Sequence, residues 1–300
     1  MRTSTSEFVT GFIGYAPPTR TEIYLCSTPE EYAEVGNTPP EAKPAVGASA
    51  GQWSNGVLSY YNTFSGSGVA HEFVHAVESQ LLGFERPTWW KEGLACYLTY
   101  KFTGEPGPGG IYPDQLSDFT RSILENDPPF KNLSELEGEI VLTKFDYEES
   151  TSVFLFIEEN YGESKIKEII RAADAMENVH AAFQAVLGVS FQAFEAGWRK
   201  CLTRSVVAIA EAKSAVGAAE REGRTHGLHE AKARLSEAQN AFNFGRFGEA
   251  LEKASEAYTI AESATHEAAG PSQGAPWIWA GVGIAVAVIV LAFLLTRKRK

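Results

Sequence analysis

Hydrophobic residues upstream of Gly83 recur with the period of an α-helix. They stand four positions apart and therefore share one face: Phe73, Val77 and Leu81. His71 and His75, also four positions apart, lie on roughly the opposite face. Glycine and serine residues precede the run, and Gly83 marks its end. The pattern predicts a helix that packs one face into a core and leaves the other free for chemistry.

Further elements are predicted on both sides of this helix. Helix-start signals stand at Thr28 and directly before Trp89. Strands are predicted at 21–25 and 57–64, and further helices at 114–126, 150–161, 164–175, 179–187 and 205–222. Proline, alanine and glycine between residues 39 and 51 predict a loop. Together these elements predict an α+β, mostly helical fold with a small N-terminal β-sheet.

Two heptad-like runs predict a helical hairpin towards the C-terminus. Leucine, alanine and aromatic residues repeat over 228–242 and again over 251–261, and Phe244, Gly245 and Arg246 form the turn between them. A single hairpin is too short for a solenoid. We therefore expect a helical hairpin stalk that serves as a spacer or docking element.

Residues 277–295 predict one transmembrane helix. They carry no charge, and at ~1.5 Å per residue such a run is long enough to cross a hydrocarbon layer of ~30 Å. The four basic residues that follow place the C-terminus in the cytoplasm by the positive-inside rule. The first sixteen residues do not resemble a signal peptide. The chain is therefore expected to be part of a longer precursor or, against the charge rule, to be tail-anchored.

The balance of charge narrows the possible partners. The net charge is −12 and the last four residues contribute +4, so the remaining chain carries −16. An acidic body disfavours nucleic acid and anionic lipid surfaces as partners. Cysteine stands at three widely separated positions, 26, 96 and 201, which form neither a disulfide framework nor a zinc ribbon.

Residues 71–75 read His-Glu-Phe-Val-His, which is the pattern HExxH. Two imidazoles one helical turn apart reach the same metal ion, while Glu72 lies beside that ion and handles a proton. Two of the five positions are free, so the pattern also arises by chance on exposed helices that bind no metal. A third ligand has to decide between these interpretations.

Two glutamates are candidates for the third ligand. Glu78 shares the histidine face, but seven residues from His71 place it ~10 Å further along the axis, so we expect it beside the site or facing solvent. Glu92 lies on the helix predicted after Pro87, which a short loop lets fold back, and small residues follow it. We therefore expect His71, His75 and Glu92 to bind one Zn²⁺.

A resemblance to a known family rests on two segments, HEFVH and WWKEGLACYL. They are similar to the gluzincin zinc metallopeptidases, and the segments at 147–162 and 182–198 resemble the peptidase-MA-like family within that superfamily. The resemblance covers roughly residues 21–202. It implies that His71, His75 and Glu92 hold Zn²⁺ and that Glu72 is the general base acting on a zinc-activated water.

The resemblance also implies roles for three other parts of the chain. Tyr147 matches a tyrosine whose phenol stabilises the oxyanion of the tetrahedral intermediate, although packing alone also explains a tyrosine before an apolar helix. The strand at 57–64 borders the cleft and takes extended substrate by strand addition. Cys96 stands where many gluzincins have an acidic partner for a histidine, so the orienting group differs here.

These observations predict five parts of the chain and one favoured function. The parts are a metallopeptidase domain at 1–202, a helical hairpin stalk at 203–268, a linker at 269–276, a transmembrane helix at 277–295 and a basic cytoplasmic tail at 296–300. We expect a single-pass membrane-anchored zinc metallopeptidase that hydrolyses peptide or protein substrates outside the cytoplasm. One alternative is a catalytically inactive relative that serves as a membrane-anchored binding module. Another is a structural membrane protein whose HExxH is accidental.

Overall fold

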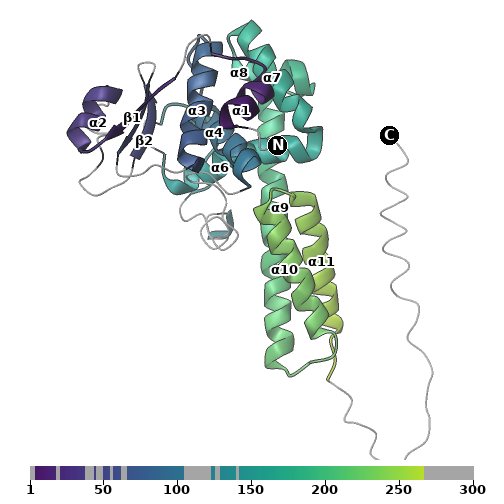
Figure 1. Ribbon diagram of the computed structural model, residues 1–300. Helices are drawn as coiled ribbons and strands as arrows, with labels where there is room; N and C mark the ends of the chain where they lie inside the picture. The colour runs from purple at the N-terminus through teal and green to yellow at the C-terminus, as the bar shows by residue number, and fades with distance from the viewer. Residues whose placement is uncertain are drawn as a thin grey trace, which may run out of the picture. The chain divides into compact units, whose positions relative to one another are not determined.

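A computed structural model of the chain describes residues 4–17, 21–37, 44, 50–54, 57–61, 66–104, 123–125, 129–139 and 142–266. The fold is mostly helical with one small sheet, as the sequence predicts (Figure 1). The strands are β1 (Glu22–Cys26), β2 (Ala50–Ser54) and β3 (Val57–Tyr61). The helices of the first half are α1 (Thr5–Ile13), α2 (Pro29–Gly36), α3 (Gly66–Leu81) and α4 (Thr88–Thr103), followed by the short 3₁₀ helix η2 (Leu133–Glu135). Those of the second half are α6 (Lys144–Tyr161), α7 (Glu163–Met176), α8 (Val179–Leu187), α9 (Phe191–Arg221), α10 (Leu228–Asn243) and α11 (Phe247–Ser263).

The sheet has the strand order β1-β3-β2, with β3 in the centre. β3 pairs with β1 in parallel and with β2 antiparallel, so both of its edges are occupied. The expectation that the strand at 57–64 takes substrate by strand addition is therefore wrong, because no edge of β3 is left to accept another strand. β2, which lies partly within the predicted loop at 39–51, is the edge strand beside it.

The helix that carries HExxH forms where its apolar pattern predicts, but the face expected to stay open is enclosed as well, since His71 is 3% exposed and Glu78 is fully buried. α3 begins at Gly66 and ends at Leu81, and Val74 and Val77 are fully buried in the main core. α4 starts after Pro87 and ends at Thr103, because Gly104, with a positive φ of 72°, terminates the helix. Nearly the whole middle of α4 is buried, because it packs against α3 on one side and α6 on the other.

Gly93 allows α4 to approach α6 closely. A Cβ atom at position 93 would lie 2.5 Å from the backbone oxygen of Ser150 and 2.8 Å from Cε2 of Phe154. A glycine is therefore required at position 93 because α6 lies against it. The sequence alone does not identify α6 as this neighbour. Contact at this distance leaves no room for a side chain without separating the two helices.

Replacing Gly93 by Ala is expected to lower the free energy of unfolding by ~1–3 kcal/mol, because α4 and α6 have to move apart. Gly197→Ala in α9 is the matched control, since its Cβ would meet only Phe156 Cζ at 4.0 Å. That substitution is expected to stabilise the helix by up to ~1 kcal/mol. Urea unfolding of both variants measures the difference. Equal stabilities would contradict the close approach of α4 and α6.

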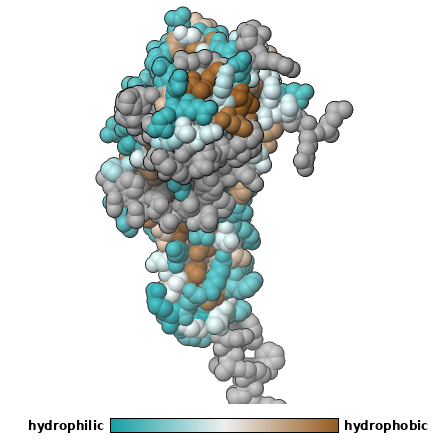
Figure 2. All heavy atoms as spheres, turned by 60° about the vertical axis from the view of Figure 1, so that its left-hand side comes forward, coloured by the Kyte–Doolittle hydropathy of each residue, from teal (hydrophilic) through white to brown (hydrophobic). Residues whose placement is uncertain are grey.

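The C-terminal part of the described chain is a three-helix bundle. α10 and α11 form the hairpin that the sequence predicts, and both pack along the 31-residue helix α9 (Figure 1). Its interior consists largely of alanine: Ala212, Ala231, Ala238, Ala250, Ala254, Ala257 and Ala261. On the face shown in Figure 2, a narrow hydrophobic strip along the bundle is bordered by hydrophilic residues. The described hairpin is therefore one side of a bundle completed by α9.

The expected boundary between residues 202 and 203 falls inside α9. Trp198, Leu202 and Val206 are fully buried on either side of that point and belong to the same core. The hairpin turn also touches the body of the protein, since a Cβ at Gly245 would lie 2.5 Å from Cβ of Leu155. Residues 1–265 accordingly form one compact unit.

Several predicted elements lie outside the described residues. They are the helix at 114–126, except for 123–125, and the linker, transmembrane helix and tail at 269–276, 277–295 and 296–300. Among the helices that the structure does describe, none combines the length and the apolar character needed to cross a bilayer.

Candidate metal centre

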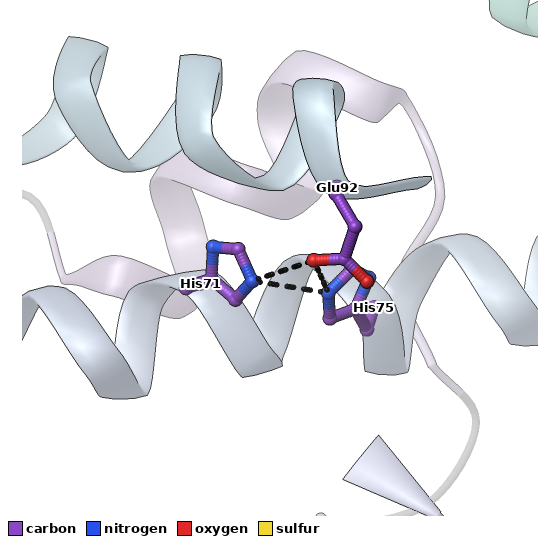
Figure 3. Close-up of side chains that lie close together, drawn as sticks. All are labelled: His71, His75 and Glu92. Atoms are coloured by element: carbon purple, nitrogen blue, oxygen red, sulfur yellow. Dashed lines mark hydrogen bonds and ion pairs between the residues drawn. The ribbon is translucent and has the colours of Figure 1, made fainter. Parts of the chain in front are cut away.

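Three side chains from two helices converge on one point, as the sequence predicts (Figure 3). His71 and His75 come from α3, and Glu92 reaches them from α4. The Nε2 atoms of the two histidines are 3.2 Å apart. Oε2 of Glu92 lies 3.2 Å from Nε2 of His71 and 3.3 Å from Nε2 of His75. The three donor atoms thus form a nearly equilateral triangle.

The size of this triangle fits a zinc ion. Zn²⁺ in proteins is tetrahedral, with bonds of ~2.0–2.1 Å to imidazole nitrogen and to carboxylate oxygen, which separates its ligand atoms by ~3.3 Å. The three observed separations agree with that spacing. Three protein ligands also leave one position of a tetrahedron open, which is the arrangement of catalytic rather than structural zinc sites. The donor set can therefore hold a divalent metal ion, and Zn²⁺ is one ion whose spacing it fits.

His71 is held by neighbours on both sides of its ring. It is buried, and its Nδ1 lies 3.6 Å from Sγ of Cys96. Burial lowers the pKa of His71, but Cys96 and then the carboxylates of Glu92 and Glu72 outweigh burial and raise it well above its usual range. Cys96 thus contacts the ring nitrogen of His71 that does not face Glu92.

The surroundings of Glu92 keep its carboxylate charged. Burial raises the pKa of Glu92, but the imidazoles of His75 and His71 outweigh burial and hold it well below its usual range. The pair of histidines therefore favours an anionic ligand at this position. A divalent cation bound here would replace the proton that otherwise balances this charge.

Glu72 lies beside the three converging side chains rather than among them. Within the described part of the chain, the group able to share one ion consists of His71, His75 and Glu92. Glu72 is 8% exposed, and its Oε1 would lie 3.4 Å from a Cβ atom at Gly51 in β2. The carboxylate that the sequence assigns to proton transfer thus faces the edge strand of the sheet.

Tyr147 lies next to the candidate ligands, in the first turn of α6. Its ring centre is 6.3 Å from that of His71. Burial, followed by the charges of Glu92 and the neighbouring Cys96 and Glu72, raises the pKa of Tyr147 well above its usual range. The phenol therefore keeps its proton at neutral pH and is available as a hydrogen-bond donor.

Two further tyrosines near Glu72 were not found from the sequence. Tyr32 in α2 and Tyr60 in β3 are 3% and 2% exposed. Burial and then the charge of Glu72 raise the pKa of both phenols. Tyr60 also donates a hydrogen bond to the carbonyl of Gly68 in the first turn of α3, 3.3 Å away. Alternation along β3 is a signal for the inward side chain of Tyr60, whereas nothing in the sequence marks Tyr32.

Glu78 is neither a ligand nor a solvent-facing residue. Its side chain is fully buried, and Oε1 accepts a hydrogen bond from Nε1 of Trp90 at 2.7 Å. Of the two positions expected for Glu78, facing solvent is therefore excluded, and a place beside the candidate ligands remains. The described structure places Glu78 in contact with the start of α4 instead.

No family model, curated protein or solved structure matches the chain.

Proposed function

We propose that the protein is a zinc-dependent metallopeptidase of the gluzincin type. The single observation that carries the proposal is the triangle of His71, His75 and Glu92 donor atoms, with Glu72 next to it on the same helix. Two neutral nitrogen donors and one carboxylate oxygen suit Zn²⁺. When bound, the metal supplies Lewis acidity, which polarises a carbonyl and makes water more acidic.

The side chains of the site divide the remaining work of peptide hydrolysis. Glu72 accepts the proton of the attacking water and returns it to the leaving amine, because it lies beside the ligands without belonging to them. Tyr147 donates a hydrogen bond to the developing oxyanion, consistent with its protonated phenol. Cys96 holds the ring of His71 in place.

An extended substrate backbone is proposed to pair with β2 along its outer side in the described sheet. β2 is the outer strand of the described sheet on the side of α3. Its Gly51 lies next to Glu72, so a peptide added to this edge would run past the general base. Strand addition of substrate, first expected for the strand at 57–64, is thereby assigned to β2.

Metal analysis tests the proposed site. Protein prepared without chelators is expected to contain stoichiometric zinc, and His71→Ala is expected to lose it, because one of three protein ligands is removed. His229→Ala is the matched control, since His229 is exposed on α10 and far along the chain from the site. Wild-type protein that binds no added zinc, or a His71→Ala variant that binds as tightly as wild type, would overturn the proposal.

Membrane anchoring is a second part of the proposal. This part rests on the sequence, in which residues 277–295 carry no charge and residues 297–300 are all cationic. We expect protease added to intact cells or right-side-out vesicles to remove the zinc domain. Protection of that domain until detergent is added would place it in the cytoplasm and reverse the proposed orientation.

A further inference from the structure

A buried polar cluster connects the two helices that carry the candidate ligands. Oε1 of Glu78 in α3 accepts a hydrogen bond of 2.7 Å from Nε1 of Trp90 in α4. The same oxygen lies 3.3 Å from Nε of Arg86 in the connection between these helices. Arg86 in turn donates from Nη1 to the carbonyls of Leu82, at 2.6 Å, and Phe84, at 2.8 Å. We call Glu78, Arg86 and Trp90 the clamp.

The clamp lies close to the ligands on both helices. Glu78 follows His75 by three residues on α3, and Trp90 precedes Glu92 by two on α4. A helix rises ~1.5 Å per residue, so each end of the clamp is within ~5 Å of a ligand along its helix axis. Sliding or turning α4 against α3 would therefore stretch the Glu78–Trp90 hydrogen bond and the ligand triangle together.

Stability alone does not account for the clamp. Glu78 and Trp90 are fully buried, and removing a carboxylate and a guanidinium from water costs more than their attraction returns unless the geometry is well satisfied. Apolar side chains of similar volume would fill the same space at least as favourably. An apolar pair would not provide a directional hydrogen bond. Such a bond fixes one register between two packed helices.

We propose that the clamp is a positioning device that sets the register of α4 on α3 and thereby preorganises the metal site. This inference rests on the proposed metal site and adds to it three residues that touch neither metal nor substrate. With the clamp intact, the three donor atoms hold their triangle before the metal arrives. Without it, part of the binding free energy is spent on ordering the two helices, and the affinity for zinc falls.

Adjacent tryptophans offer a matched pair of variants. Trp90→Phe removes the indole N–H that donates a hydrogen bond to Glu78. Trp89→Phe removes an indole N–H that has no hydrogen-bond partner among the described residues. Both indoles are fully buried in the same core and on the same helix. The two substitutions therefore remove similar volume from the core, but only Trp90→Phe breaks the clamp.

Zinc affinity of the folded, metal-free protein is measured by competition with a chromophoric chelator. Trp90→Phe is expected to weaken zinc binding by about tenfold or more, in the range found when supporting hydrogen bonds of metal sites are removed. Trp89→Phe is expected to lower the melting temperature similarly but to leave the zinc affinity close to that of wild type. Equal zinc affinities of the two variants would overturn the clamp while leaving the metal site intact. Wild-type protein that binds no zinc would overturn both.

Substitutions at Glu78 repeat the test from the other helix and serve if Trp90→Phe does not fold. Glu78→Gln keeps an oxygen that accepts the Trp90 N–H, whereas Glu78→Leu does not. We expect Glu78→Leu to weaken zinc binding about as much as Trp90→Phe, and Glu78→Gln to recover most of the loss. A role in stability alone predicts instead that both variants bind zinc as wild type does once they are folded.

Discussion

Replacing Glu72 by Gln is expected to lower the rate of peptide hydrolysis by at least ~10²-fold while zinc remains bound, because an amide does not accept the proton of water. Glu72 lies on α3 directly after His71 but outside the triangle of donor atoms. The substitution keeps the size of the side chain and its place beside β2. Retained metal with lost activity is thus the signature of a proton-transfer role.

The assay combines two measurements on the same protein. Hydrolysis is followed with a library of internally quenched peptides, and zinc content is measured on the same preparation. Glu85→Gln is the matched control, because the Glu85 side chain is 90% exposed in the connection between α3 and α4 and pairs only with Lys91 among the described residues. That variant is expected to keep wild-type activity. Loss of zinc from Glu72→Gln would mean that Glu72 supports the metal, and the proposed role would be wrong.

Inactivity of the wild-type protein towards the whole library would favour the binding-module alternative. In that case the zinc content still reports on the metal site, because it does not depend on turnover. The two measurements therefore separate a metalloenzyme from a metal-binding domain without hydrolytic activity.

The arrangement of the three candidate ligands follows from local sequence patterns, which explains why it could be predicted. The spacing of His71 and His75 fixes their common face on any helix. Which face is buried was not predicted correctly, since His71 and Glu78 are buried whereas Phe73 and Leu81 are only partly buried. Glu92 needed only one further assumption, that the helix after Pro87 folds back on α3. α3 has nearly the predicted limits, and α4 begins after Pro87 as predicted.

Tyr147 and Cys96 were expected beside the site, but the rest of its surroundings depends on pairings that are distant in sequence and were not predicted. β2 contains Gly51 and has little strand propensity of its own, so its existence depends on pairing with β3. The hydrogen bond from Trp90 to Glu78 joins two helices. The sequence pattern predicts only that each of these residues lies on a helix, and it does not predict their contact. α1 illustrates a missed local signal, since Ser4 and Glu7 form a capping box that marks its start.

A second buried carboxyl group makes a prediction about stability rather than activity. Glu149 in α6 is fully buried. Burial raises its pKa from 4.5 to about 9; Arg199 opposes this shift, Asp146 adds to it, and Lys131 opposes it. The folded protein therefore keeps Glu149 protonated at neutral pH, whereas the unfolded chain releases that proton.

The sign of the pH dependence follows from this difference in bound protons. Between pH 4.5 and about 9 the folded state holds one proton more than the unfolded state at this position, so raising the pH favours unfolding. The contribution of Glu149 to the free energy of unfolding is fully present at low pH. It falls by up to ~1.4 kcal/mol for each pH unit within this window. At pH 8 the free energy of unfolding is thus lower than it would be with a neutral side chain of the same shape at position 149.

Glu149→Gln is expected to raise the free energy of unfolding at pH 8 by at least ~2 kcal/mol and to change it little at pH 5, because the amide resembles the protonated acid and never ionises. Urea unfolding of metal-free protein at pH 5, 7, 8 and 9 measures this difference. Glu163→Gln is the control: its lysine neighbours outweigh burial and lower the pKa of Glu163, so it is ionised in both states above pH ~6 and should leave the slope between pH 7 and 9 unchanged. A Glu149→Gln variant whose stability follows the wild-type pH profile would show that Glu149 ionises normally in the fold, and that water or a cation reaches it between α6 and α9.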